Sequence, residues 1–365
     1  MFRNVTAEKA IAFTQFCVAL TFCWPLPSMA TKRQVFRFKI LRFILFLNAL
    51  MLLLPLLYAM HVHRGDAGNM GKAGLLTLGV MLVLSQTSLS IVEYERFQRA
   101  SSRERQVFQR YIDKYSTFYG VSAVWFYATA SMVILGTLFL SDPLPTNAEY
   151  PFAVNFEPVR SIIFVHQAIV GFQCAAHISI GIFCALLLLF SAARLEILMI
   201  ELRTVKDTAS LIKCVKNYRI AKRYAKEVVS SIRSITLITV IMCGVATVFC
   251  GITFIGRQPF AVKVQFLSLA SLALLKVFMC AWPADHLIDM SENVMQGAYE
   301  SKWYKQSLRM QKLILFMLVP QAPVTLSIKS IIPTLSLNYY TSFISNVFSL
   351  FTVLRVAMFR DDDNN

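Results

Sequence analysis

The chain of 365 residues is 56% hydrophobic and 13% aromatic, with 29 Phe. Only 15% of its residues are charged, against about 25% in an ordinary soluble domain. Charges are nearly absent from several windows of about 20 residues, the length that a helix needs to cross a bilayer core. This distribution excludes a typical soluble domain, a disordered chain and a secreted disulfide scaffold. The net charge of +16 would suit nucleic acid, but the basic residues lie between apolar segments, which indicates a cytoplasmic membrane surface instead.

Apolar segments predict membrane-spanning helices, because a backbone exposed to lipid must satisfy its hydrogen bonds internally. Six strong segments are 40–60, 74–92, 121–140, 161–193, 234–256 and 262–282. The fourth is too long for one crossing, so we expect it to extend into the cytoplasm. The region 313–358 is long enough for two crossings, but its first half contains Pro320 and Pro323 and is a poor lipid-facing helix. We therefore expect seven crossings, with the proline-rich half kept within protein.

Lysine and arginine orient these spans. The segments 1–42, 93–118, 194–233 and 284–312 hold most of the 36 basic residues. The positive-inside rule places them, and with them the N-terminus, in the cytoplasm. The expected fold class is an all-α membrane protein with seven transmembrane helices, a cytoplasmic N-terminus and an extracellular C-terminus. A G-protein-coupled receptor has the reverse orientation, and its D-R-Y and N-P-x-x-Y motifs are missing.

This interpretation divides the chain into consecutive parts. The stretch 195–233 lacks Gly and Pro, so we interpret it as a solvated helical extension that could join a cytoplasmic helical bundle. The expected parts are a cytoplasmic N-terminal segment (1–39), transmembrane helices one to four (40–193), a cytoplasmic helical linker (194–233), helices five and six (234–283), a cytoplasmic anchor region (284–333), a pore helix (334–358) and an extracellular tail (359–365).

Catalytic chemistry has no signature in this sequence. The Walker, H-E-x-x-H and G-x-S-x-G motifs are absent, and none of the 8 cysteines forms a C-x-x-C pair. We therefore expect no enzyme activity, no cofactor and no metal, and we interpret the cysteines as buried thiols. His61 and His63 suit solvated side chains at a helix end better than metal ligands. His166 and His177 share one face of the fourth span, where they either bond within the bundle or contact a ligand or water-filled cavity.

The last helix carries a stripe of small polar residues. Ser345, Asn346 and Ser349 fall within about 60° of Ser342 on a helical projection, and Val353 and Val356 continue the stripe. Such a stripe packs against other helices or lines water. In the second case, several copies around an axis would form a pore that is narrowed by the valines, and hydrophobic constrictions of this kind gate by dewetting. Without a ring of acidic residues, the pore would discriminate weakly among cations.

Three sequence stretches resemble insect odorant receptors. The stretch 282–304 is similar to the pattern that follows the sixth span in that family, with matching residues at Ser291, Ala298, Tyr299, Trp303 and Tyr304. The C-terminal stretch 335–355 resembles the last segment of the family, and the outer loop 144–152, followed by His166 and Gln167, is a weaker match. Together the resemblance covers essentially the whole chain.

The resemblance implies a tetrameric, odorant-gated, nonselective cation channel in the plasma membrane of olfactory neuron dendrites. A tuning receptor of this family assembles into a heterotetramer with a shared co-receptor. By position, Val353 would lie at the gate, whereas Val356 replaces a glutamine of the co-receptor pattern. The chain also lacks the longer linker of the co-receptor, which favours a tuning subunit. The implied partners are a small volatile odorant, the co-receptor, membrane lipid and permeating cations, with no nucleic acid.

The family binds odorants within each subunit, in the outer half of the membrane. Such a pocket is mostly apolar. For each single residue there, a lipid-facing or core position is a more common role than contact with a ligand. An alternative is a gustatory receptor, although the C-terminal T-Y-x-x-x-x-x-Q-F of that family is not found. A metabotropic receptor or a transporter is a further alternative. The expected pocket residues are Leu76, Gly79, Val80, Val83, Ser131, Ile134, Leu138, Phe164, Gln167, Val170, Gly171, Cys174, Phe266 and Ala270.

Overall fold

The computed structural model describes residues 6–21, 31–63, 67–86, 102–140, 144–146, 148–154, 156–255, 259–328 and 331–362. Within these ranges the regular elements are helices, with one isolated bridge between Ile328 and Ile332, so the predicted all-α class is confirmed. The helices are α1 (Ala7–Cys17), η1 (Ala19–Thr21), α2 (Lys32–Val62), α3 (Ala67–Gln86), α5 (Ser102–Leu140), α6 (Val159–Arg203), α7 (Thr208–Ile255), α8 (Phe260–Asn293), α9 (Gln296–Glu300), η2 (Trp303–Lys305), α10 (Leu308–Met317) and α11 (Leu337–Asp362).

Side-chain caps set the start of two long helices. At α2, the backbone N–H of Gln34 donates to Thr31 Oγ1 at 3.3 Å, and the N–H of Thr31 donates to Gln34 Oε1 at 2.8 Å, which makes a capping box. Before α7, the backbone N–H and the hydroxyl of Ser210 donate to the Asp207 carboxylate at 2.8 and 2.7 Å. These hydrogen bonds hold the pKa of the Asp207 carboxyl below its usual value.

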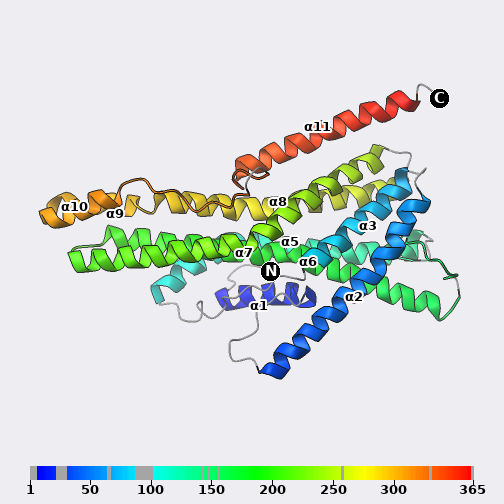
Figure 1. Ribbon diagram of the computed structural model, residues 1–365, viewed down its shortest axis with the longest axis horizontal. Coiled ribbons are helices and arrows are strands. Elements are labelled where there is room, and N and C mark those ends of the chain that lie inside the picture. Colours follow the sequence, from blue (N-terminus) through cyan, green and yellow to red (C-terminus); the bar gives the residue numbers. More distant parts are fainter. Residues whose placement is uncertain are drawn as a thin grey trace.

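The longest helices are α6 and α7, with 45 and 48 residues. At about 1.5 Å per residue each is about 70 Å long, whereas a bilayer core is about 30 Å thick. Each helix is therefore long enough both to cross a membrane and to project well beyond it. The turn between them lies at the left end of Figure 1, beside α9 and α10.

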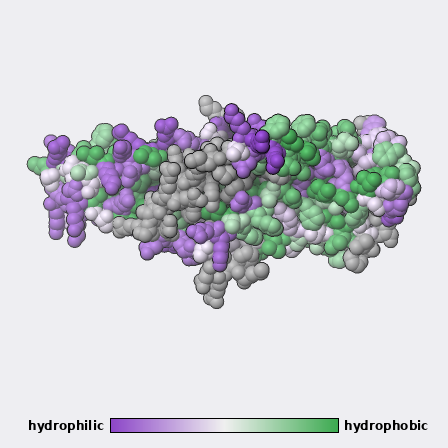
Figure 2. Space-filling view, turned by 90° about the horizontal axis from the view of Figure 1, so that it is seen from below, coloured by the Kyte–Doolittle hydropathy of each residue, from purple (hydrophilic) through white to green (hydrophobic). Residues whose placement is uncertain are grey.

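The core of the molecule forms around α6. This helix packs against α3, α5, α7 and α8, and 83% of its most apolar window is buried. Among the described residues, five helices are long and apolar enough to cross a membrane, namely α2, α5, α6, α7 and α8, and α3 contributes a shorter apolar stretch at Ala73–Leu84. The predicted end of the second span, at residue 92, lies outside the described residues. Figure 2 shows hydrophobic side chains gathered toward the right half of the visible face, away from α10.

The described residues of the proline-rich segment between α10 and α11 form no helix, because proline lacks the backbone N–H that a helix interior uses and therefore disfavours helix formation. It lies against α8, where the backbone N–H of Val324 donates to the Ser291 hydroxyl at 2.9 Å. The N–H of Leu337, at the start of α11, donates to Asp285 Oδ1 at 3.2 Å. Apolar side chains of the segment, including Leu326 and Leu335, are buried in the main core, so the segment fixes the position from which α11 departs.

Candidate functional site

The structure brings together part of the predicted pocket. Leu76, Val80 and Val83 of α3 pack with Val170 and Cys174 of α6 in one hydrophobic cluster, which α2 also joins. These residues recur at helical spacing, so each helix turns one apolar face toward the other.

In the same region, two glycines lie in van der Waals contact with side chains of a neighbouring helix. A Cβ placed on Gly79 of α3 would lie 3.7 Å from the Sγ of Cys174. One placed on Gly171 of α6 would lie 3.5 Å from Cδ1 of Ile134 on α5. Three helices therefore meet here with small residues at their contacts. A space lined in this way favours apolar molecules through shape and dispersion.

The remaining predicted pocket residues lie around this cluster. Phe266 and Ala270 of α8 pack in a separate small cluster with Cys250 of α7 and Leu75 of α3. Because Leu75 and Leu76 are neighbours, α3 is common to both clusters.

Three further predicted pocket residues, two on α5 and one on α6, are not among the described members of either cluster. Ser131 is half-buried, and its hydroxyl donates to the carbonyl oxygen of Tyr127 in the same helix at 2.9 Å. The side chain of Leu138 lies outside the described part of the structure, and Phe164 of α6 is half-buried.

Gln167 of α6 holds the loop that contains Thr146 and Tyr150. Its side chain is 1% exposed; its Oε1 accepts from the backbone N–H of Thr146 at 2.9 Å, and its Nε2 donates to the Tyr150 hydroxyl at 3.1 Å. The same loop reaches α2, where the backbone N–H of Glu149 donates to the carbonyl oxygen of Pro55 at 3.3 Å and the Glu149 carboxylate lies 3.2 Å from His63 Nε2. Ala148 and Tyr150 of this loop pack on the cluster, so the loop covers the end of the cluster that is nearest the start of α6. The sequence match at 144–152 was a signal for these contacts, although it did not identify them.

Two buried nitrogen atoms that have no hydrogen-bond partner among the described residues lie beyond this cluster. His177 continues the row of Gln167, Val170 and Cys174 along α6 and is 0% exposed. Its Nδ1 lies 2.9 Å from the carbonyl oxygen of Gln173, but its Nε2 has no hydrogen-bond partner among the described residues.

Lys276 of α8 supplies the second nitrogen. The residue is 3% exposed, and its Nζ also has no hydrogen-bond partner among the described residues. Lys276 lies at the level of His177, because Gly181 of α6 and Cys280 of α8, each one turn further along its helix, face each other where the two helices pack together. Lys276 is not among the site residues predicted from the sequence, although a lone ionisable residue inside an apolar span is itself a signal of function.

The polar stripe on α11 faces away from its own chain. All six of its predicted pore residues are exposed in the single subunit, including Val353 at 64% and Val356 at 62%. The opposite face of α11 packs against α7, where Phe343 and Phe351 lie over Gly244 and Gly251. The predicted pore residues are Ser342, Ser345, Asn346, Ser349, Val353 and Val356.

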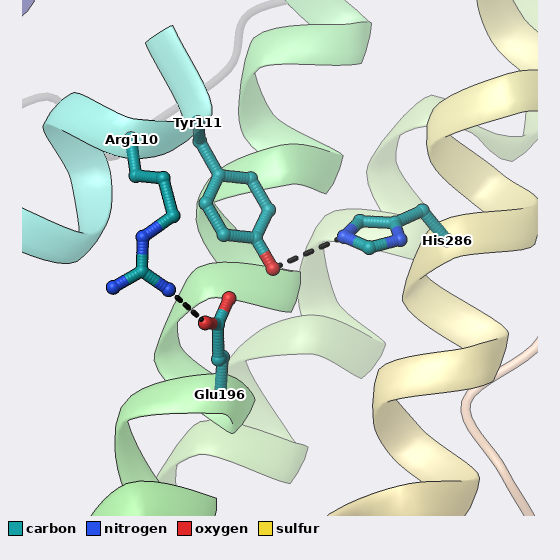
Figure 3. Close-up of polar contacts among 4 residues, drawn as sticks. All are labelled: Arg110, Tyr111, Glu196 and His286. Carbon is teal, nitrogen blue, oxygen red and sulfur yellow. Dashed lines mark hydrogen bonds and ion pairs between the residues drawn. The ribbon is translucent and has the colours of Figure 1, made fainter. Parts of the chain in front are cut away.

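A cavity of about 410 Å³ lies elsewhere, between α1, α5 and α6. Its walls are mainly aromatic and aliphatic. Next to it, Arg110 Nη1 lies 2.8 Å from Glu196 Oε1, and the Tyr111 hydroxyl lies 3.1 Å from His286 Nε2 (Figure 3). These contacts join α5, α6 and α8 beyond the pocket cluster. The residues that line the cavity include Phe13, Tyr111, Tyr115, Tyr119, Leu189 and Phe190.

Metal-binding chemistry has no candidate site in the part of the chain that the structure describes, because no three His, Cys, Asp or Glu side chains cluster there.

Comparison with known proteins supplies an independent line of evidence. The model of the 7tm odorant receptor family matches residues 84–348. Odorant receptor 49a of Drosophila melanogaster is 37% identical over 70 residues, which span 19% of this chain and 17% of that protein.

Two solved structures have a similar fold. The insect olfactory receptor OR5 from Machilis hrabei aligns with a TM-score of 0.76 at 16% identity, over 95% of this chain and 97% of its own. The same receptor in complex with eugenol aligns with a TM-score of 0.74 at 15% identity, over 95% and 98% of the two chains. The similarity to an insect olfactory receptor confirms the predicted all-α fold, and the apolar helices make the chain a multi-pass membrane protein. The number of crossings and the orientation of the termini stay predictions.

Proposed function

Since this chain belongs to the 7tm odorant receptor family, we propose that it is a ligand-gated, nonselective cation channel subunit that is opened by a small volatile odorant. The family confirms a receptor rather than an enzyme, and it favours this function over a gustatory receptor, a metabotropic receptor or a transporter. The working assembly is a heterotetramer with the shared co-receptor in the plasma membrane of the olfactory dendrite.

The observation that carries this proposal is the exposure of the polar stripe on α11. A helix that crosses lipid does not ordinarily turn a row of serine and asparagine side chains outward. Asn346 and Ser349 are exposed on that row, while Phe343 and Phe351 on the other face pack against α7. Several subunits that meet along this row would enclose a polar path. The exposed valines, Val353 and Val356, would then form its narrowest, dewetted part.

Odorant binding would act on this path through α7 and α8. Both helices contribute to the cluster around Phe266 and Cys250, and both pack against α11. A ligand that fills the outer pocket favours the open arrangement only as far as it binds that arrangement more tightly than the closed one. The similar Machilis hrabei receptor was solved with eugenol, which supports a small organic ligand here as well.

Electrical recording tests the proposal. This chain, co-expressed with the co-receptor in a cell without other chemosensory proteins, is exposed to odorant mixtures under voltage clamp. We expect inward cation currents that require both subunits and begin within seconds. The absence of current when both subunits are at the cell surface would reject the channel function.

A further inference from the structure

A buried amine whose N–H groups lack a hydrogen-bond partner is costly inside a membrane bundle, and Lys276 is such a group among the residues that the structure describes. Its side chain is 3% exposed, so it does not extend to the membrane surface as lysines near helix ends do. Its Nζ has no hydrogen-bond partner among the described residues. The helices α6 and α8 pack together, and a Cβ placed on Gly181 of α6 would lie 4.0 Å from the Sγ of Cys280 on α8. Lys276 precedes Cys280 by one turn and His177 precedes Gly181 by one turn, so the two residues lie at the same level of this contact.

The hydrogen-bonding capacity of His177 complements that of Lys276. The carbonyl oxygen of Gln173 can only accept, so His177 Nδ1, which lies 2.9 Å from it, carries a hydrogen and donates. In a neutral ring the other nitrogen, Nε2, is then unprotonated and can only accept. Nε2 is buried and has no partner in the described part of the chain. Lys276 therefore offers an unused donor, and His177 an unused acceptor.

Both groups lie next to the predicted pocket. His177 follows Cys174 by one turn on α6, and Cys174 packs with the pocket residues of α3. Lys276 lies at the level of His177 across the contact between α8 and α6. The two polar groups are thus at the inner end of an otherwise apolar cluster whose outer end is covered by the Gln167 contacts.

We propose that Lys276 and His177 form the polar floor of the odorant pocket and select ligands that carry a hydroxyl group. A hydroxyl oxygen can accept from Lys276 Nζ while its hydrogen is donated to His177 Nε2. An ether, ketone or ester only accepts, so it satisfies Lys276 alone, and a hydrocarbon satisfies neither. This inference rests on the proposed function, because it assigns the ligand class of the same pocket.

The test uses the complete receptor with its co-receptor and ligands matched in size. One set is octanol, heptyl methyl ether and nonane, and a second is phenethyl alcohol, benzyl methyl ether and propylbenzene. For the skeleton that fits the pocket, we expect the alcohol to activate at a concentration about 10-fold below that of the ether, with the hydrocarbon weakest. Equal potencies in both sets, in a receptor that responds to other odorants, would overturn the proposal.

Variants separate the two roles. Lys276→Met should raise the half-activating concentration of the alcohol about 10- to 100-fold and leave that of the hydrocarbon unchanged. His177→Phe should abolish the advantage of the alcohol over the ether but keep the advantage of the ether over the hydrocarbon. Lys263→Met, the same substitution near the start of α8, is the matched control and should leave the ranking intact.

A packing role for Lys276 predicts a different result, because Lys276→Met would then shift all three ligands by the same factor. If Lys276→Met fails to reach the cell surface, Lys276→Gln keeps a neutral donor of similar length, and it should retain part of the alcohol preference. A wild-type complex at the cell surface that responds to no odorant at all would reject the proposed function. A wild-type complex that responds to odorants without preferring alcohols would reject only the polar floor.

Discussion

Phe351 of α11 lies directly against Gly251 of α7, so that a Cβ placed on the glycine would come within 2.5 Å of Cδ2 of the ring. Two turns earlier on α7, Gly244 faces Phe343, but there a Cβ would lie 3.5 Å from the ring, at ordinary contact distance. The first site is therefore closed to any larger residue unless Phe351 moves, whereas the second site has room for a methyl group.

Gly251→Ala should reduce the odorant-evoked current. The added methyl group displaces Phe351 and pushes α11 away from α7, toward the side on which its exposed polar stripe lies. If that stripe lines the pore, the path narrows, and we expect a maximal current several-fold lower at equal surface expression. Gly244→Ala is the matched control and should leave the current unchanged. A Gly251→Ala channel with normal current would show that this contact does not position the pore helix.

Val353→Asn should produce current without odorant. The residue is 64% exposed in the single chain, so the change should alter the free energy of unfolding by no more than about 0.5 kcal/mol. In a hydrophobic constriction, however, an amide admits water and removes the dewetting barrier. Holding current before odorant application is the measurement. Val319→Asn, at a site that is 57% exposed and outside α11, should leave the holding current at its wild-type level.

Gln167→Leu should destabilise the outer loop and weaken odorant responses. The substitution removes both hydrogen bonds of the amide and leaves the backbone N–H of Thr146 buried without its partner. We expect a loss of about 1–3 kcal/mol in the free energy of unfolding, seen as a lower melting temperature of the purified complex. Gln296→Leu removes an exposed hydrogen bond to Glu300 and should have little effect. Equal melting temperatures for the two variants would contradict the role given to Gln167.

Gly297→Ala should impair folding. A Cβ at this residue of α9 would collide with the backbone carbonyl of Met199 on α6, and backbone moves less readily than a side chain. Overpacking of this kind costs about 1–3 kcal/mol, and surface expression should fall accordingly. Gly181→Ala on α6, where the nearest atom outside the helix would lie 4.0 Å away, should express normally. Normal expression of Gly297→Ala would mean that α9 can shift relative to α6.

Much of the fold could be predicted from the sequence, because long apolar segments can satisfy their backbone only as helices. The prolines at 320 and 323 correctly indicated that their segment is not a lipid-facing helix. The stretch 195–233, interpreted as a helical extension, is helical except for a turn between the end of α6 at Arg203 and the start of α7 at Thr208. The position of that turn was harder to predict, because the stretch contains no Gly or Pro.

The candidate site was predictable only in part. The family resemblance assigned Val80, Val83, Val170 and Phe266 to one pocket. The structure packs the three valines in one cluster and Phe266 in a separate one. The sequence singled out His177 but not its relation to Lys276, because that relation depends on which atoms lack partners. That information exists only once the helices are packed against each other.

The burial of Lys276 has a consequence for biosynthesis. A lysine at the centre of an isolated transmembrane helix disfavours insertion by about 2.5–3.5 kcal/mol, and here the helix concerned is α8. The helices α6 and α7, which surround this lysine, precede α8 in the chain. They are therefore synthesised before α8. When α8 enters the bilayer, the two helices that shield the Lys276 side chain from lipid are already present.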